Sequence, residues 1–128
     1  MLENIIIKQT ESTPLITLNE VSNELFFTGI LIPDNSVDFF RPLIIWINKY
    51  QDEAKAGFKF VIELEHFNTP SSILLLKVMK RINKIPNQKI IWFVDSEDED
   101  MIEVVDQYDE LMGGGVIDLR LKKAKISD

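Results

Sequence analysis

The chain has 128 residues, with 14 basic and 21 acidic side chains, a formal charge of −7 at pH 7 and a pI near 4.7. The 45% hydrophobic and 27% charged content is typical of a globular domain, and we expect one domain over residues 1–128. The absence of cysteine excludes a disulfide framework and a thiolate metal site, and the acidic balance disfavours nucleic-acid binding.

The first part of the chain predicts three strands. Residues 5–8 begin with three isoleucines, residues 15–18 alternate apolar and polar, and residues 24–29 are rich in β-prone side chains. The second and third strands are joined by a polar turn, so we expect them to pair as an antiparallel hairpin. No apolar run approaches the roughly 20 residues of a membrane span, so we expect a cytoplasmic protein without membrane insertion.

A long helix is predicted from residue 35 or 36 to about residue 56, because a side-chain oxygen at either start position can cap it and Gly57 can end it. Pro42 must lie in the first two turns or bend the helix. The wide apolar face, which includes Trp46 and Tyr50, is expected to pack in the core. An exposed aromatic surface for a partner is the alternative.

The rest of the chain alternates strands with helices, which is typical of a mainly parallel sheet. The acidic residues 95–100 suit a helix start, and Gly113–Gly115 suit a helix end. The predicted fold class is therefore α/β, with a mixed, mostly parallel sheet, an N-terminal antiparallel hairpin and about three helices. The remaining strands are expected at 58–64, 89–95 and 116–121, and the remaining helices at about 70–84 and 96–112.

The main candidate site lies between the strand at 58–64 and the helix that follows it. Thr69 suits the N-cap position of that helix and Pro70 its first helical residue, and capping alone explains the pattern. The functional alternative is phosphorylation of Thr69, which would add negative charge at the positive end of the helix dipole. The residues expected to shape this loop are His66, Asn68, Ser71 and Ser72.

An ordered set of short motifs runs through the chain from about Thr10 to Arg120. The motifs are Ser12-Thr13-Pro14, Gly29 with Pro33-Asp34-Asn35, Phe40, Trp46, and Leu64-Glu65-His66-Phe67-Asn68-Thr69 followed by Ser71-Ser72. The run from Leu64 to Thr69 is the most specific of them. In this order the motifs resemble the SiaC family of bacterial regulatory phosphoproteins, whose fold is similar to that of STAS-type anti-sigma-factor antagonists. The resemblance implies that the α/β fold is a single STAS-like domain.

The resemblance implies a regulatory role for Thr69. It implies that a partner Ser/Thr-type kinase phosphorylates this residue and that a PP2C-type phosphatase reverses the modification. It further implies that the unphosphorylated protein binds and activates a diguanylate cyclase, which makes cyclic di-GMP. Pro70 stands where family members often carry serine, so kinase recognition is an open question and Ser71 or Ser72 are alternative acceptors.

A basic stripe on the predicted helix at 70–84 is a second candidate, as a surface that docks an acidic partner. A solvated helix face is the simpler explanation of the same pattern. The stripe consists of Lys77, Lys80, Arg81 and Lys84.

Little in the sequence favours catalysis, metal binding or a cofactor. The acidic run at 95–100 lacks the glycine and spacing of a calcium loop, and Gly113–Gly115 lack the strand–glycine loop–helix order of a nucleotide site. His66 is the one histidine. We therefore expect no enzymatic activity, no metal and no cofactor. The alternatives are an anti-sigma-factor antagonist in a partner-switching pathway, and a small enzyme or ligand-binding domain.

Overall fold

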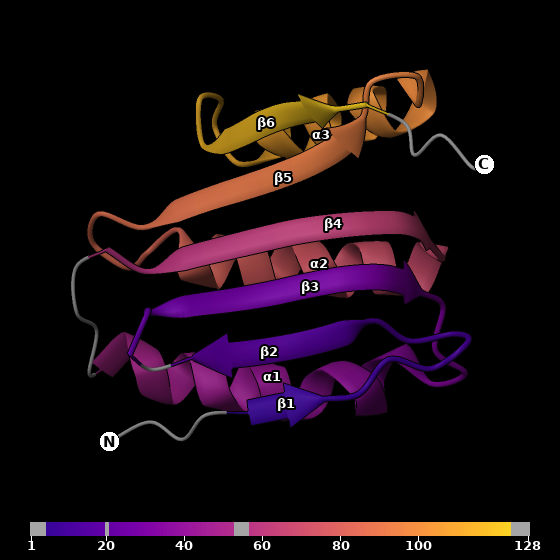
Figure 1. The fold of residues 1–128 in the computed structure, drawn as a ribbon. Coiled ribbons are helices and arrows are strands. Elements are labelled where there is room, and N and C mark those ends of the chain that lie inside the picture. The colour runs from indigo at the N-terminus through magenta and orange to yellow at the C-terminus, as the bar shows by residue number, and fades with distance from the viewer. Residues whose placement is uncertain (1–4, 20, 53–56, 124–128) are drawn as a thin grey trace.

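The computed structural model of the chain describes residues 5–19, 21–52 and 57–123. Strands and helices follow one another in the predicted order (Figure 1). No helix within these residues is long and apolar enough to cross a bilayer. The elements are β1 (Ile5–Ile7), β2 (Leu15–Asn19), β3 (Glu24–Leu31), α1 (Ser36–Asp52), β4 (Lys59–Phe67), α2 (Thr69–Ile82), β5 (Lys89–Asp95), α3 (Glu99–Leu111) and β6 (Ile117–Lys122).

The described strands form a six-stranded sheet whose spatial order, β1 to β6, is the same as the chain order. β1, β2 and β3 pair antiparallel, and β3 to β6 pair parallel, which confirms the predicted mixed sheet and N-terminal hairpin. All the described helices cover one face: α1 lies behind β1 and β2, α2 behind β3 and β4, and α3 behind β5 and β6 (Figure 1). None of the described helices lies on the other face of the sheet.

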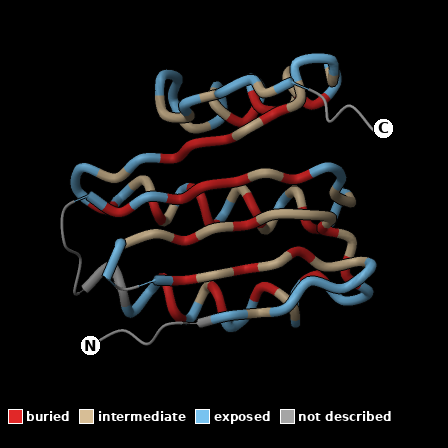
Figure 2. The backbone as a smooth tube through the Cα atoms, viewed as in Figure 1, coloured by how far each residue is buried: buried red, intermediate tan, exposed pale blue. Residues whose placement is uncertain are grey.

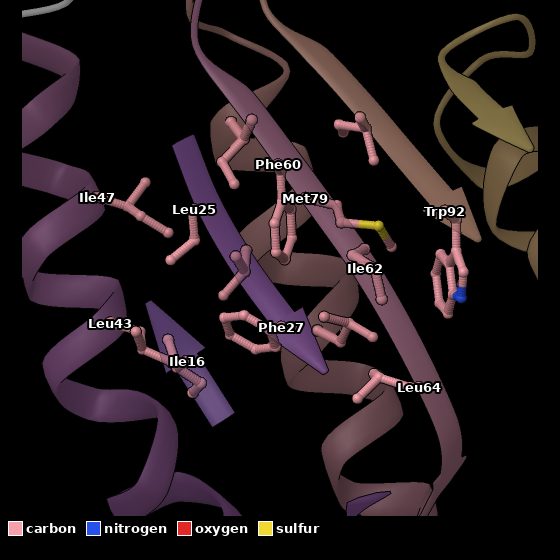
Figure 3. Close-up of a cluster of buried hydrophobic side chains, with 14 of the residues drawn as sticks. Ile16, Leu25, Phe27, Leu43, Ile47, Phe60, Ile62, Leu64, Met79 and Trp92 are labelled. Carbon is pink, nitrogen blue, oxygen red and sulfur yellow. The ribbon is translucent and has the colours of Figure 1, made fainter. Parts of the chain in front are cut away.

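The core fills the space between the sheet and its helix layer, where buried residues line the strands and the inner sides of the helices (Figure 2). Phe27 and Phe60 meet edge to face with their ring centroids 5.1 Å apart, a favoured aromatic geometry. Figure 3 shows the aliphatic residues of β2, β3 and β4 packed towards α1 and α2. Trp46 is 8% exposed and belongs to this core, whereas the side chain of Tyr50 lies outside the described residues.

Helix α1 begins as predicted, because the Oδ1 atom of Asn35 accepts a hydrogen bond from the N–H of Asp38 at 3.1 Å. Pro42 lies inside α1 in its second turn, where the helix continues past it. The described part of α1 ends at Asp52, and the predicted extension to residue 56 falls on residues 53–56, outside the description.

Strand β4 is longer than predicted. His66 and Phe67, expected in a loop, pair with Ile30 and Leu31 of β3. The register shifts between Gly29 and Ile30, so Glu65 is the extra residue of a β-bulge. The prediction of a loop was wrong because such a shift depends on the partner strand, and a polar pair such as Glu65-His66 resembles a strand end in sequence.

The turn between α3 and β6 is closed by one carboxylate. Gly113, Gly114 and Gly115 all have positive φ angles, of 104°, 84° and 72°, which glycine adopts without a steric penalty. The carboxylate of Asp109 accepts hydrogen bonds from the N–H groups of Gly115, Val116 and Ile117 at 2.8–2.9 Å. Burial by itself raises the pKa of this carboxyl, but the N–H donors outweigh it and hold the pKa of Asp109 below its usual value.

Asp109→Asn is expected to lower the free energy of unfolding by about 1–2 kcal/mol at pH 7, because hydrogen bonds to a charged acceptor are replaced by weaker ones. A carboxyl whose pKa is lower in the folded state stabilises above its unfolded pKa of about 3.9, and this stability is lost as the pH falls through the folded pKa. Urea denaturation at several pH values should therefore show the two proteins converging in acid. The control is Asp106→Asn, an exposed carboxyl on the same helix. An equal loss in both variants would contradict the prediction.

Candidate functional site

The segment from His66 to Ser72, here called the Thr69 segment, joins the end of β4 to the first turn of α2. Asn68 has an extended backbone and its N–H donates to the carbonyl of Leu31 at 3.2 Å, so β3 holds the start of the turn. The Oδ1 atom of Asn68 accepts from the N–H of Ser71 at 3.1 Å. Asn68 is therefore the N-cap, and the prediction that Thr69 caps the helix was wrong. Asparagine and threonine are both good caps, and the extended β4 fixes which one occupies the position.

The three hydroxyl side chains of this segment lie in different environments. Thr69, the first residue of α2, is exposed, and within the described part of the chain its hydroxyl makes no hydrogen bond. Ser71 is 0% exposed, and its Oγ atom lies 3.0 Å from the Oγ atom of Ser36 at the start of α1. The half-buried Ser72 donates its hydroxyl to the carbonyl of Thr69 at 2.7 Å. An enzyme can thus reach Thr69 without disturbing the fold, but not Ser71.

Aromatic side chains of β4, β5 and α3 pack together and support the Thr69 segment. Phe67 stacks on Tyr108 of α3 with the ring centroids 6.2 Å apart, and Trp92 of β5 lies 5.6 Å from the ring of Tyr108. The hydroxyl of Tyr108 donates to the carbonyl of Ser72 at 2.9 Å. Burial raises the pKa of Tyr108 to about 12, so the phenol stays protonated and remains a donor. The first turn of α2 is therefore fixed to α3 by Tyr108 and to α1 by Ser36.

The predicted basic stripe divides into two parts. Lys77, Lys80 and Lys84 are exposed, whereas Arg81 is half-buried and its Nη1 atom donates to the Oδ1 atom of Asn48 on α1 at 2.5 Å. Arg81 thus joins two helices, and the lysines present their charges to solvent. His66 is exposed on β4, in the strand rather than in a loop.

A cleft opens between β4 and β5 at their carboxyl ends. Their pairing stops at Ile62 and Trp92, although both strands continue and remain paired with their outer neighbours. The cavity there has a volume of about 550 Å³ and is not lined by the Thr69 segment. An ion pair between Glu63 and Lys122 bridges β4 and β6 beside it. The residues that line the cavity include Glu63, Leu64 and Glu65 of β4 and Phe93, Val94 and Asp95 of β5.

The acidic run at 95–100 serves the turn before α3. Asp95 accepts from the N–H of Glu97 at 2.9 Å, and Asp98 caps α3 by accepting from the N–H of Met101 at 3.0 Å. Among the described residues, no group of three or more histidine, aspartate or glutamate side chains is arranged to hold a metal ion.

Three residues that contact the Thr69 segment or its aromatic support carry no signal in the sequence for that role: Ser36, Tyr108 and Trp92. The sequence predicts residue 36 only as a possible cap of α1. Tyr108 and Trp92 simply lie within the helix predicted at about 96–112 and the strand predicted at 89–95. Their contacts with the segment cross between elements that are far apart in the chain, and helix or strand periodicity carries no information about them.

Comparison with solved structures supports the fold. One chain in the complex of the diguanylate cyclase SiaD with its activator SiaC from Pseudomonas aeruginosa matches with a TM-score of 0.83 and 20% identity, covering 92% of this chain and 99% of that one. Apo-SiaC from the same organism matches with a TM-score of 0.81 and 19% identity, covering 96% of this chain and 100% of that one. Among curated proteins, none matches this chain.

Sequence comparison with protein families gives the assignment that the fold alone does not. The match is to the SiaC family regulatory phosphoproteins and extends over residues 7–120, nearly the whole chain. It includes the end of β4, the Thr69 segment and every described helix. The chain therefore belongs to the SiaC family of regulatory phosphoproteins.

Proposed function

We propose that this protein is a binding switch in which phosphorylation of Thr69 controls the binding and activation of a diguanylate cyclase. The observation that carries the proposal is the contrast between the exposed, unbonded Thr69 hydroxyl and the buried or bonded hydroxyls of Ser71 and Ser72. The family is one of regulatory phosphoproteins, and the related Pseudomonas aeruginosa SiaC is the activator of the cyclase SiaD. Both facts support a binding switch that is controlled by phosphorylation.

The local geometry favours a change of surface rather than a change of fold. Pro70 has no N–H, and the N–H of Ser71 is already bonded to Asn68. A phosphoryl group on Thr69 therefore finds few free backbone donors and stays outward, with a charge of about −1.5 to −2. The contacts of Ser36 and Tyr108 hold the first turn of α2 in place beneath it. The added charge and bulk then act directly on the partner that approaches this surface.

The chemistry of the switch is supplied by other proteins in this proposal. A Ser/Thr-type kinase adds the phosphoryl group and a PP2C-type phosphatase removes it, and the chain itself has no catalytic activity. In this proposal the switch acts in the cytoplasm. The alternative acceptors Ser71 and Ser72 are disfavoured by burial and by an existing hydrogen bond, respectively.

Thr69→Asp is expected to weaken binding to the cyclase of the source organism by about tenfold or more, because it adds a negative charge to the contact surface, whereas Thr69→Ala should bind like wild type. Isothermal titration calorimetry on the purified proteins measures both. Peptide mass spectrometry of the protein from its native host should locate a mass increase of roughly 80 Da, one phosphoryl group, on Thr69.

The matched control is Ser22→Asp, which adds the same charge at an exposed position in the turn between β2 and β3. Equal binding by wild type, Thr69→Asp and the phosphorylated protein would reject the switch. Recovery of a sigma-factor regulator in place of a cyclase from native lysate would favour the anti-sigma-factor antagonist.

A further inference from the structure

Helices α1 and α2 lie side by side and run parallel, and together they present one outer surface. At their starts, the Oγ atoms of Ser36 and Ser71 are 3.0 Å apart. Near their ends, Asn48 accepts a hydrogen bond from Arg81 at 2.5 Å. Figure 1 shows the two helices as neighbours behind β1 to β4. Their outer sides face away from the sheet, and no other described element covers them.

On α2 the outward residues form a single stripe that starts at Thr69. At about 100° per residue, Thr69, Ile73, Lys77 and Lys80 fall within a sector of about 80°. The helix predicted to reach residue 84 ends at Ile82, so Lys84 lies in the turn just after α2. All of these residues except Ile82 are exposed, and Ile73 is 57% exposed. Its neighbour in this stripe, Lys77, begins a run of positive charge on a chain whose net charge is −7.

On α1 two further large apolar side chains face solvent. Val37 is 57% exposed and Ile45 is 50% exposed. They are two helical turns apart, about 12 Å along the axis. Between them, Asp38 is already paired with Arg41 at 3.1 Å, so its charge is compensated. Among the α1 side chains that the structure describes, the outer ones thus add apolar contacts and no unpaired carboxylate beside the lysines.

We propose that this surface binds an acidic amphipathic helix of the partner, laid across the outer sides of α1 and α2. The proposal rests on the binding switch proposed above and specifies the partner's chemistry. Apolar residues of such a helix, spaced i and i+7, match the spacing of Val37 and Ile45. Its carboxylates meet the lysines. The surface, here called the α1–α2 surface, consists of Val37, Ile45, Ile73, Lys77, Lys80 and Lys84.

The position of Thr69 explains why phosphorylation opposes binding of such a partner. Thr69 begins the same stripe as Ile73 and the lysines, so a phosphoryl group there lies at one end of the α1–α2 surface. An acidic helix is attracted by the lysines and repelled by the phosphate. A basic partner would instead bind the phosphorylated form more tightly, so the sign of the switch depends on the partner's charge.

Calorimetric titration of the full chain with the cyclase of its source organism tests the surface. We expect Lys77→Glu/Lys80→Glu to weaken binding at least tenfold at low salt, with a smaller effect at high salt because of screening. Ile73→Gln and Val37→Gln should each weaken binding about tenfold with little salt dependence. The charge control is Lys59→Glu/Lys89→Glu, at the starts of β4 and β5 and so at the other end of β4 from Thr69. The apolar control is Leu111→Gln on α3. These control positions are exposed.

The possible results separate the two proposals. Loss of binding in the surface variants but not in the controls supports the α1–α2 surface. If the surface variants bind like wild type, the proposed α1–α2 surface is rejected. A loss of binding by Thr69→Asp would still support the phosphorylation switch. If the surface variants instead abolish a dimer of the protein alone in sedimentation velocity, a second copy occupies the surface and the proposed partner helix is rejected. If the wild type does not bind the cyclase but binds another protein through this surface, the surface stands and the choice of a cyclase fails.

Discussion

Ser71→Asp is expected to lower the free energy of unfolding by about 3–5 kcal/mol, whereas Thr69→Asp is expected to leave it unchanged or raise it by up to about 1 kcal/mol. Ser71 is 0% exposed beside the hydroxyl of Ser36, so a carboxylate there is buried without a cation. Thr69 is exposed at the first residue of α2, where the helix dipole favours negative charge. Two positions only two residues apart should therefore respond oppositely to the same substitution.

Urea denaturation followed by circular dichroism measures both effects, with Thr69→Ala and Ser71→Ala as matched controls. Ser71→Ala should cost about 1–2 kcal/mol, since the buried hydroxyl of Ser36 is left without its partner. A similar small effect of aspartate at both positions would contradict the prediction. It would also restore Ser71 as a possible phosphate acceptor, which the burial of its side chain now disfavours.

Trp92→Ala is expected to lower the free energy of unfolding by about 3–5 kcal/mol, because a large, fully buried side chain is replaced by a cavity. Trp92 contacts both Phe67 and Tyr108, which support the Thr69 segment. Among the described residues, the indole N–H of Trp92 has no hydrogen-bond partner. Trp92→Phe removes this unsatisfied donor while it keeps most of the apolar contact, so it should cost only about 1–2 kcal/mol.

Denaturation of the two variants in parallel checks this difference. A Trp92→Phe variant as unstable as Trp92→Ala would mean that the indole N–H makes a stabilising hydrogen bond in solution. Native-state hydrogen exchange adds a local measurement. Trp92→Ala should increase exchange at the start of α2 more than at the hairpin of β2 and β3, because the aromatic contacts of Phe67 and Tyr108 lie beneath the Thr69 segment.

The sequence predicted the order of strands and helices because each element carries its own periodicity and its own end signals. The acidic start of α3, the glycines after it and the apolar run of β5 are local features, and all appear where they were expected. The end of a strand is not predictable from local sequence where pairing with a neighbouring strand decides it. The end of β4 moved to Phe67 because the bulge with β3 lets the pairing continue past Glu65.

At the candidate site, the sequence alone identified the hydroxyl-rich segment at the start of a helix and the lysines that follow it. Only the tertiary structure decided that Asn68 caps α2, that Ser71 is buried against Ser36, that Thr69 remains exposed, and that Arg81 bonds to α1 instead of facing solvent. The physical reason is that helix periodicity describes one helix by itself. Which hydroxyl is covered and which cation is engaged depend on the packing of α1 and α3 around α2, and those contacts join residues more than 30 positions apart in the chain.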